Sequence, residues 1–253
     1  MKRSPGPRKT THLSDSVHRQ LNSYALVASA AGVSLIALAP LAEGKVVYTK
    51  THKLINPDIT FDLDLNHDGI ADFGVKNRFA QYKTHYGIHT FETLTARPDR
   101  NGNAVWGHVV STTTAKWTYA SALHANVQIG PTGKFLSGAG MMVSGNASTW
   151  SGRCFSSRRG SWINIANRYL GLKFVIGRKT HFGWARLSVR LNQGCSAEIH
   201  AILTGYAFET IPNKPIITGK TKGPDVVTVQ DLSLGHLARG ASAIPAWRIK
   251  ESQ

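Results

Sequence analysis

The stretch HFGWARLSVRL, residues 181–191, shows what class of fold this chain adopts. Phe182 and Trp184 stand two positions apart, so in an extended backbone their side chains share one face. Aromatic, Val and Leu residues dominate the stretch, as they do in half-buried strands. We therefore predict a β-strand here, with one of its faces in the core.

Seven further stretches are rich in the same residue types and are separated by Gly, Asn, Pro and Ser. Asn101-Gly102, between two of them, is a strong signal for a tight turn. The eight predicted strands are residues 45–50, 59–65, 89–96, 104–112, 125–130, 169–177, 181–191 and 198–209. Because no convincing amphipathic helix interrupts them, we predict an all-β domain over residues 45–210, an antiparallel β-sandwich or jelly roll.

The two ends of the chain differ from this domain in composition. Residues 1–44 combine a basic start with the uncharged run Tyr24–Ala42, which is typical of an export signal cleaved before Lys45. A retained membrane anchor is the alternative. Residues 211–253 are rich in Pro, Gly and Lys and are predicted to form an extended linker and tail, with a marginal helix near residues 232–241. We expect a secreted or cell-surface protein.

The chain is strongly basic, with 30 Lys and Arg against 14 Asp and Glu. Without residues 1–44 the balance is still 25 against 12. The positive charges are scattered, and no nucleic-acid-binding motif accompanies them. We therefore expect an acidic polysaccharide or a cell-surface glycan as partner, no nucleic acid, and membrane contact only through an uncleaved signal segment.

The chain has two cysteines, Cys154 and Cys195. An even pair in an exported protein is typically bridged, so we predict a disulfide between them. Two unrelated buried thiols are the alternative.

The motif Asp64-x-Asn66-x-Asp68-Gly69-x-x-Asp72 has the spacing of a calcium-binding loop. Side-chain oxygens at alternate positions converge on one point when the chain turns sharply, and calcium takes six to eight such ligands. The predicted ligands are Asp64, Asn66, Asp68, Asp72 and the main-chain carbonyl of Ile70, whose side chain is expected to turn to the core.

The position of the bidentate glutamate of an EF-hand is occupied by Val75, so the EF-hand itself is excluded. Clustered carboxylates repel one another, and a divalent cation removes that penalty. The alternative needs no metal. In it, Asp62 and Asp64 form the solvent face of a strand that ends in an Asp-Gly turn.

No constellation of catalytic residues stands out, and we expect no enzymatic activity. The histidines are isolated, and the sequence does not place any two of Glu92, Glu198 and Glu209 as a glycosidase pair. Five tryptophans of the domain fill the core or stack on sugars. They are Trp106, Trp117, Trp150, Trp162 and Trp184.

Several segments resemble a group of uncharacterised exported proteins of Gram-negative bacteria, of the PEP-CTERM-like type. They include DLDLNHDGIADF (62–73), THFGWARL (180–187) and YAFETIPNKPI (206–216). The resemblance implies an exported, surface-associated β-rich protein and carries no established activity. The tail departs from the sorting pattern, because it lacks the Pro-Glu-Pro motif and its apolar stretch is broken by His236, Arg239 and Pro245.

The sequence thus predicts a non-catalytic exported protein of the cell surface or extracellular matrix, a β-sandwich with a structural calcium loop. The alternative is a carbohydrate-binding module or a degenerate glycoside hydrolase with a lectin-like sandwich.

Overall fold

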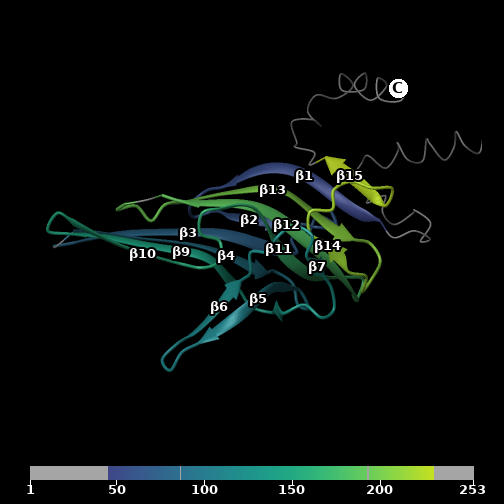
Figure 1. The fold of residues 1–253 in the computed structure, drawn as a ribbon, viewed down its shortest axis with the longest axis horizontal. Coiled ribbons are helices and arrows are strands. Elements are labelled where there is room, and N and C mark those ends of the chain that lie inside the picture. The colour runs from purple at the N-terminus through teal and green to yellow at the C-terminus, as the bar shows by residue number, and fades with distance from the viewer. Residues whose placement is uncertain (1–44, 86, 193, 231–253) are drawn as a thin grey trace, which may run out of the picture. The chain divides into compact units, whose positions relative to one another are not determined.

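The computed structural model describes residues 45–85, 87–192 and 194–230. The predicted signal segment and the predicted helix at 232–241 lie outside the described residues. Within the described ranges every regular element is a β-strand, which confirms the all-β prediction (Figure 1). In the same part of the chain no helix is long and apolar enough to cross a membrane.

Fifteen strands are present in the described chain. They are β1 (Val46–Ile55), β2 (Thr60–Leu63), β3 (Phe73–Thr84), β4 (Gly87–Pro98), β5 (Ala104–Ser111), β6 (Lys116–Ala120), β7 (Gln128–Ile129), β8 (Phe135–Leu136), β9 (Gly140–Trp150), β10 (Arg153–Arg159), β11 (Ile165–Ile176), β12 (Lys179–Leu191), β13 (Ile199–Glu209), β14 (Ile216–Ile217) and β15 (Val226–Gln230).

Thirteen of these strands form one curled, mixed sheet, a half-barrel with the order β15-β1-β13-β12-β11-β5-β6-β9-β4-β3-β2. β10 pairs with β9, β8 pairs with β5, and β7 and β14 form a separate two-stranded sheet. Most neighbours are antiparallel, whereas β15 on β1 and β6 on β9 are parallel.

The strands do not divide clearly into the two sheets of the predicted sandwich, because β5 belongs to both parts of the sheet. Its first residues pair with β11, at Val105↔Leu172, and its later residues pair with β6, at Gly107↔Ala120. The hydrogen bonding therefore continues around the curl. We call the strands β15, β1, β13, β12 and β11 the β12 half, and β6, β9, β10, β4, β3 and β2 the β4 half.

The main core lies inside the curl and receives side chains from both halves. Its largest fully buried members include Phe73 and Leu94 from the β4 half and Phe174 and Phe208 from the β12 half. Trp162, from the turn before β11, is also fully buried, and its indole N–H donates to the Ala120 carbonyl at 2.9 Å. Burial of this continuous apolar surface holds the two halves together.

The outer face of the β12 half is also buried. Phe182 and Trp184 lie there together, as their alternation predicts, in a second cluster that Ile129 of β7 and Ile216 of β14 cover. The opposite face of β12 packs into the main core through residues such as Leu187. Both faces of β12 are therefore buried in the core, whereas the sequence predicts one.

Residues 211–230 belong to the folded unit, although the sequence predicts an extended linker from 211. β14 pairs with β7, and β15 pairs with the first half of β1. Ile216 and Thr218 are almost fully buried. The Pro and Gly residues here shape turns that carry the chain across the sheet.

The predicted disulfide between Cys154 and Cys195 is present. It links β10 to the loop between β12 and β13, with a sequence separation of 41 residues. Nearby, the Arg158 guanidinium donates to the Asn192 carbonyl at 2.8 Å. The β9–β10 hairpin is thus fastened to the end of the β12–β13 hairpin.

Candidate functional site

The loop of residues 64–72 connects β2 to β3, and the sheet fixes both of its ends. The last pair of the two strands is Leu63↔Phe73, and the Asp72 N–H donates to the Leu63 carbonyl at 2.9 Å. Leu65 and Phe73 are fully buried, so the core anchors the loop on both sides. The polar residues between them have little freedom to move apart.

Two aspartates stabilise the turn of the loop by accepting hydrogen bonds from its backbone. The Asp64 carboxylate accepts hydrogen bonds from the N–H groups of Asp68, at 3.3 Å, and Gly69, at 2.7 Å. The Asp68 carboxylate accepts the Ile70 N–H at 2.9 Å. Gly69 has a φ of +83°, a value that favours glycine. Short acidic side chains that bond to nearby N–H groups are a common way to build such a turn.

Two buried oxygen atoms of the loop have no hydrogen-bond partner. Asp72 is fully buried, and while its Oδ2 accepts the Leu65 N–H at 3.0 Å, its Oδ1 accepts no hydrogen bond. The Oδ1 of Asn66 is also buried and unpaired, whereas its Nδ2 donates to Asp68 at 3.0 Å. An unpaired buried polar atom costs about 1–3 kcal/mol. Both atoms are oxygens, so a donor or a cation would satisfy them.

Asp72 and Asp68 have pKa values shifted in opposite directions. Burial, together with the negative charges of Asp64 and Asp68, raises the pKa of Asp72 to about 6. Burial also raises the pKa of Asp68, but hydrogen bonds from Asn66 and Ile70 and the charge of Arg100 outweigh it and hold that pKa below its ordinary value. Asp72 is therefore the carboxylate that a cation would stabilise most.

Arg100, in the turn after β4, supplies one positive charge to the loop. Its Nη1 lies 3.4 Å from Asp68 Oδ2 and 3.9 Å from Asp72 Oδ1. These two carboxylate oxygens therefore face the same point in space. The guanidinium lies at the open side of the loop, with 38% of its side chain exposed.

The structure brings together Asp64, Asn66, Asp68 and Asp72, the four predicted side-chain ligands. The prediction for Ile70 is wrong in one respect, because its side chain is 55% exposed and does not reach the core. Leu65 and Phe73 occupy the core at this position, so the loop tip projects beyond the sheet.

Two further observations bear on a metal. Val75 is buried in β3 opposite Phe61, so no ligand comes from that position. Among the described residues, no group of three or more His, Cys, Asp or Glu side chains is placed to hold a metal ion. In the loop as it stands, the Asp64 and Asp68 carboxylates bond to backbone N–H groups, and a bound ion would compete for them.

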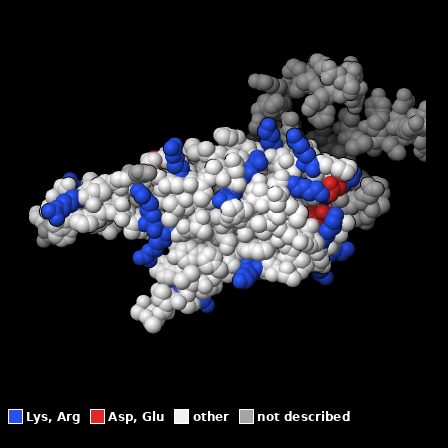
Figure 2. All heavy atoms as spheres, viewed as in Figure 1, with Lys and Arg blue, Asp and Glu red and all other residues white. Residues whose placement is uncertain are grey.

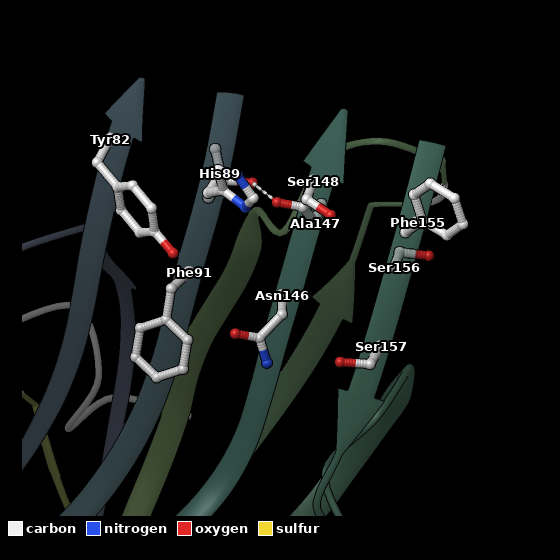
Figure 3. A pocket seen from close by; sticks show the side chains of 10 residues that line it. Tyr82, His89, Phe91, Asn146, Ala147, Ser148, Phe155, Ser156 and Ser157 are labelled. Carbon is white, nitrogen blue, oxygen red and sulfur yellow. Dashed lines mark hydrogen bonds between the residues drawn. The ribbon is translucent and has the colours of Figure 1, made fainter. Parts of the chain in front are cut away.

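A second polar surface lies on the outer face of the β4 half, where paired residues of four strands form rows (Figure 3). The first row is Tyr82, His89, Ser148 and Phe155, the second is Ala80, Phe91, Asn146 and Ser157, and the third is Arg78, Thr93, Ser144 and Arg159. We call these three rows the outer platform. Figure 3 shows that the Tyr82 and Phe155 rings lie at opposite edges of it, with Asn146 and Ser148 between them.

Two shallow hollows lie on the outer platform and share Phe91 and Asn146. The first, of about 250 Å³, is lined by Tyr82, His89 and Phe155 among others. The second, of about 540 Å³, extends to Trp117 of β6. No Asp or Glu lines either hollow. The arrangement provides exposed rings, hydroxyls, an amide and cations, but no carboxylate for acid or base chemistry.

Tyr82, Phe155 and Arg159 are not among the site residues that the sequence predicts. For the tryptophans both alternatives occur: Trp162 and Trp184 are fully buried, whereas Trp117 and Trp150 are exposed. Pairing between β9 and β10, which were not predicted as strands, is what aligns the rows. Comparisons of the chain with family models, curated proteins and solved structures find no match.

Proposed function

We propose that this is an exported, non-catalytic protein of the cell surface or extracellular matrix whose β2–β3 loop binds a structural calcium ion. The observation that carries the calcium proposal is that two buried oxygens of the loop, Asn66 Oδ1 and Asp72 Oδ1, accept no hydrogen bond. The disulfide between Cys154 and Cys195 supports an oxidising compartment.

Calcium suits this loop because every proposed ligand is an oxygen, while the imidazole of His67 bonds to Thr49. Three carboxylates, one amide oxygen and the Ile70 carbonyl are the hard ligands that calcium prefers over transition metals. The ion would pair with the two orphaned oxygens and offset the repulsion that raises the pKa of Asp72. It would also compete with Arg100, which now shares Asp68 and Asp72.

Thermal melting of the full chain in calcium and in chelator tests the proposal. At a hundred times its Kd, calcium would contribute about 2.7 kcal/mol. For a domain of this size that is roughly 5–10 °C in Tm. Arg100→Gln should melt lower in chelator and gain more from calcium, because the competing cation is gone.

Asp72→Asn should change the Tm in chelator in the opposite direction to Arg100→Gln. Asparagine keeps an acceptor for the Leu65 N–H and removes the buried charge, so this variant should melt higher than the wild type in chelator and gain nothing from calcium. Asp58→Asn is the matched control, since Asp58 is an exposed aspartate that also accepts a backbone N–H. An equal Tm in calcium and in chelator, for both the wild type and Arg100→Gln, would overturn the calcium proposal, because the variant has no arginine to compete with the ion.

A further inference from the structure

The two halves of the curled sheet differ on their outer faces. β7 and β14 cover the outer face of the β12 half, where Phe182 and Trp184 are buried. The outer platform of the β4 half carries large rings that remain open to solvent. Tyr82 is 59% exposed and Phe155 56% exposed. These rings contribute little to the core, so stability does not account for them.

The rings mark the two edges of a surface four strands wide. Neighbouring strands lie about 4.8 Å apart, so Tyr82 on β3 and Phe155 on β10 are separated by roughly 14 Å. Tyr82 is stacked on His89, with centroids 5.0 Å apart and planes 9° apart, so its ring is held in place. Asn146 and Ser148 lie between the two edges and offer an amide and a hydroxyl. Flat rings flanking hydrogen-bonding groups suit a chain of sugar rings, each with an apolar face and a rim of hydroxyls.

Charge on the outer platform is of one sign. Arg78 and Arg159 end its third row, and both are exposed. The Arg159 guanidinium lies over the Trp117 ring, 5.8 Å from its centroid, and Lys116 is adjacent. On the face drawn in Figure 2, the visible Asp and Glu atoms gather mainly at the end away from the β9–β10 hairpin, whereas Lys and Arg are spread over the surface. Glu92, the glutamate of β4, points into the core.

We infer that the outer platform binds an acidic polysaccharide, a chain of sugars that carries carboxylates. The rings at its edges receive the sugar faces, and the arginines of the third row receive the carboxylates, which guanidinium groups bind through two parallel hydrogen bonds. This site is separate from the calcium loop and does not depend on it.

Single-stranded nucleic acid is the rival occupant, because it also uses rings and cations. It requires a positive groove that follows the phosphates and closely spaced rings for successive bases. On the outer platform the cations stand in one row, and neutral side chains such as Asn146 and Ser148 separate the outer rings. A polymer with many hydroxyls and sparse charge fits this pattern better.

Affinity electrophoresis of the full chain in gels that contain polygalacturonate tests the inference. Chelator is included throughout, so that neither calcium bound to the polymer nor the β2–β3 loop contributes. Methyl-esterified polygalacturonate and an oligothymidylate serve as the uncharged and nucleic-acid comparisons. We expect binding to polygalacturonate, and about tenfold weaker binding for Arg159→Gln and for Phe155→Ala.

Two controls match these variants. Arg190→Gln removes an exposed arginine of β12, and Leu54→Ala removes a side chain that is 55% exposed on β1, against 56% for Phe155. Both should bind as the wild type does, and all four variants should melt near it, because the changed side chains are exposed. The inference is overturned if polygalacturonate does not bind, if the platform variants bind as tightly as the controls, or if oligothymidylate binds more tightly and loses affinity in the same variants.

Discussion

Glu92 lies on the inner face of β4, fully buried between the two halves of the sheet. Its Oε2 accepts the Ile199 N–H at 2.9 Å, and its Oε1 has no hydrogen-bond partner. The side chain of Asn77, on β3, interacts with the same carboxylate, and its own Oδ1 is also unpaired. Each of the two residues therefore holds a buried oxygen without a hydrogen-bond partner. The variant Glu92→Gln introduces a donor next to Asn77.

Glutamine keeps an oxygen for the Ile199 N–H and adds an NH₂ group that can donate to Asn77 Oδ1. Because an unpaired buried polar atom costs about 1–3 kcal/mol, we expect Glu92→Gln to raise the free energy of unfolding by about 2 kcal/mol at pH 7. That corresponds to a Tm higher by roughly 4–8 °C in a domain of this size. Most substitutions of core residues lower the free energy of unfolding instead.

The gain should depend on pH. Burial raises the pKa of Glu92 above its ordinary value of 4.5, and the charge of Glu198 adds to it, against the opposing effects of Ile199, Asn77 and His200. A raised pKa means that the folded state holds the proton more tightly than the unfolded state. The wild type is therefore penalised above its folded pKa and loses the penalty as pH falls toward 4.5. Glutamine does not titrate, so the difference in Tm should be largest at pH 7 and shrink toward zero near pH 4.

Thermal melting of both proteins between pH 4 and pH 7 measures this difference. Glu198→Gln, at an exposed glutamate close by, controls for the loss of one negative charge. A Glu92→Gln protein that melts lower than the wild type at pH 7 would refute the reasoning, since it would mean that the ionised carboxylate is stabilising. A gain that stays constant with pH would show that the proton plays no part.

Two further predictions concern the disulfide and a buried histidine. Cys154→Ser should lower the free energy of unfolding by about 4 kcal/mol, since the disulfide closes a loop with a sequence separation of 41 residues; non-reducing gels and melting check it, and an unchanged Tm would contradict it. His181 is buried, and although its Nδ1–H donates to the Glu209 carbonyl at 3.0 Å, burial lowers its pKa from the ordinary 6.5. An NMR titration should place its midpoint below 6.5, with stability lost as pH falls through that region, and a midpoint above 6.5 would contradict the assignment.

The strands β11, β12 and β13 could be predicted because both of their faces are apolar along much of their length. The predicted strand at 181–191 becomes β12, from 179 to 191, and that at 198–209 becomes β13, from 199 to 209. β9 and β10 were missed, because their Gly, Ser, Asn and Arg residues have low strand propensity. They are strands because β4 and the disulfide hold them, a long-range effect that local composition does not show.

The turn between β2 and β3 could be predicted from the spacing of its polar residues alone, because its aspartates act on backbone groups a few residues away. What the sequence could not show is Arg100, which reaches the loop from the turn after β4, 32 residues from Asp68. Nor could it show that Ile70 is exposed, since that depends on which side chains fill the adjacent core. The outer platform could not be predicted from the sequence, because its rows depend on the register of four paired strands.

The two proposed sites lie toward opposite ends of β3, so the proposal for one can be refuted without affecting the proposal for the other. The proposed calcium loop, residues 64–72, ends where β3 begins at Phe73, and Tyr82 of the outer platform stands nine residues further along the strand. At about 3.4 Å per residue the two positions are roughly 30 Å apart. The loop is anchored by Leu65 and Phe73, whereas Tyr82 is held by stacking on His89. Removal of calcium should therefore lower Tm without weakening the binding of polygalacturonate below that Tm. If chelator did abolish binding in a folded protein, the polysaccharide would have to contact the loop and not the outer platform.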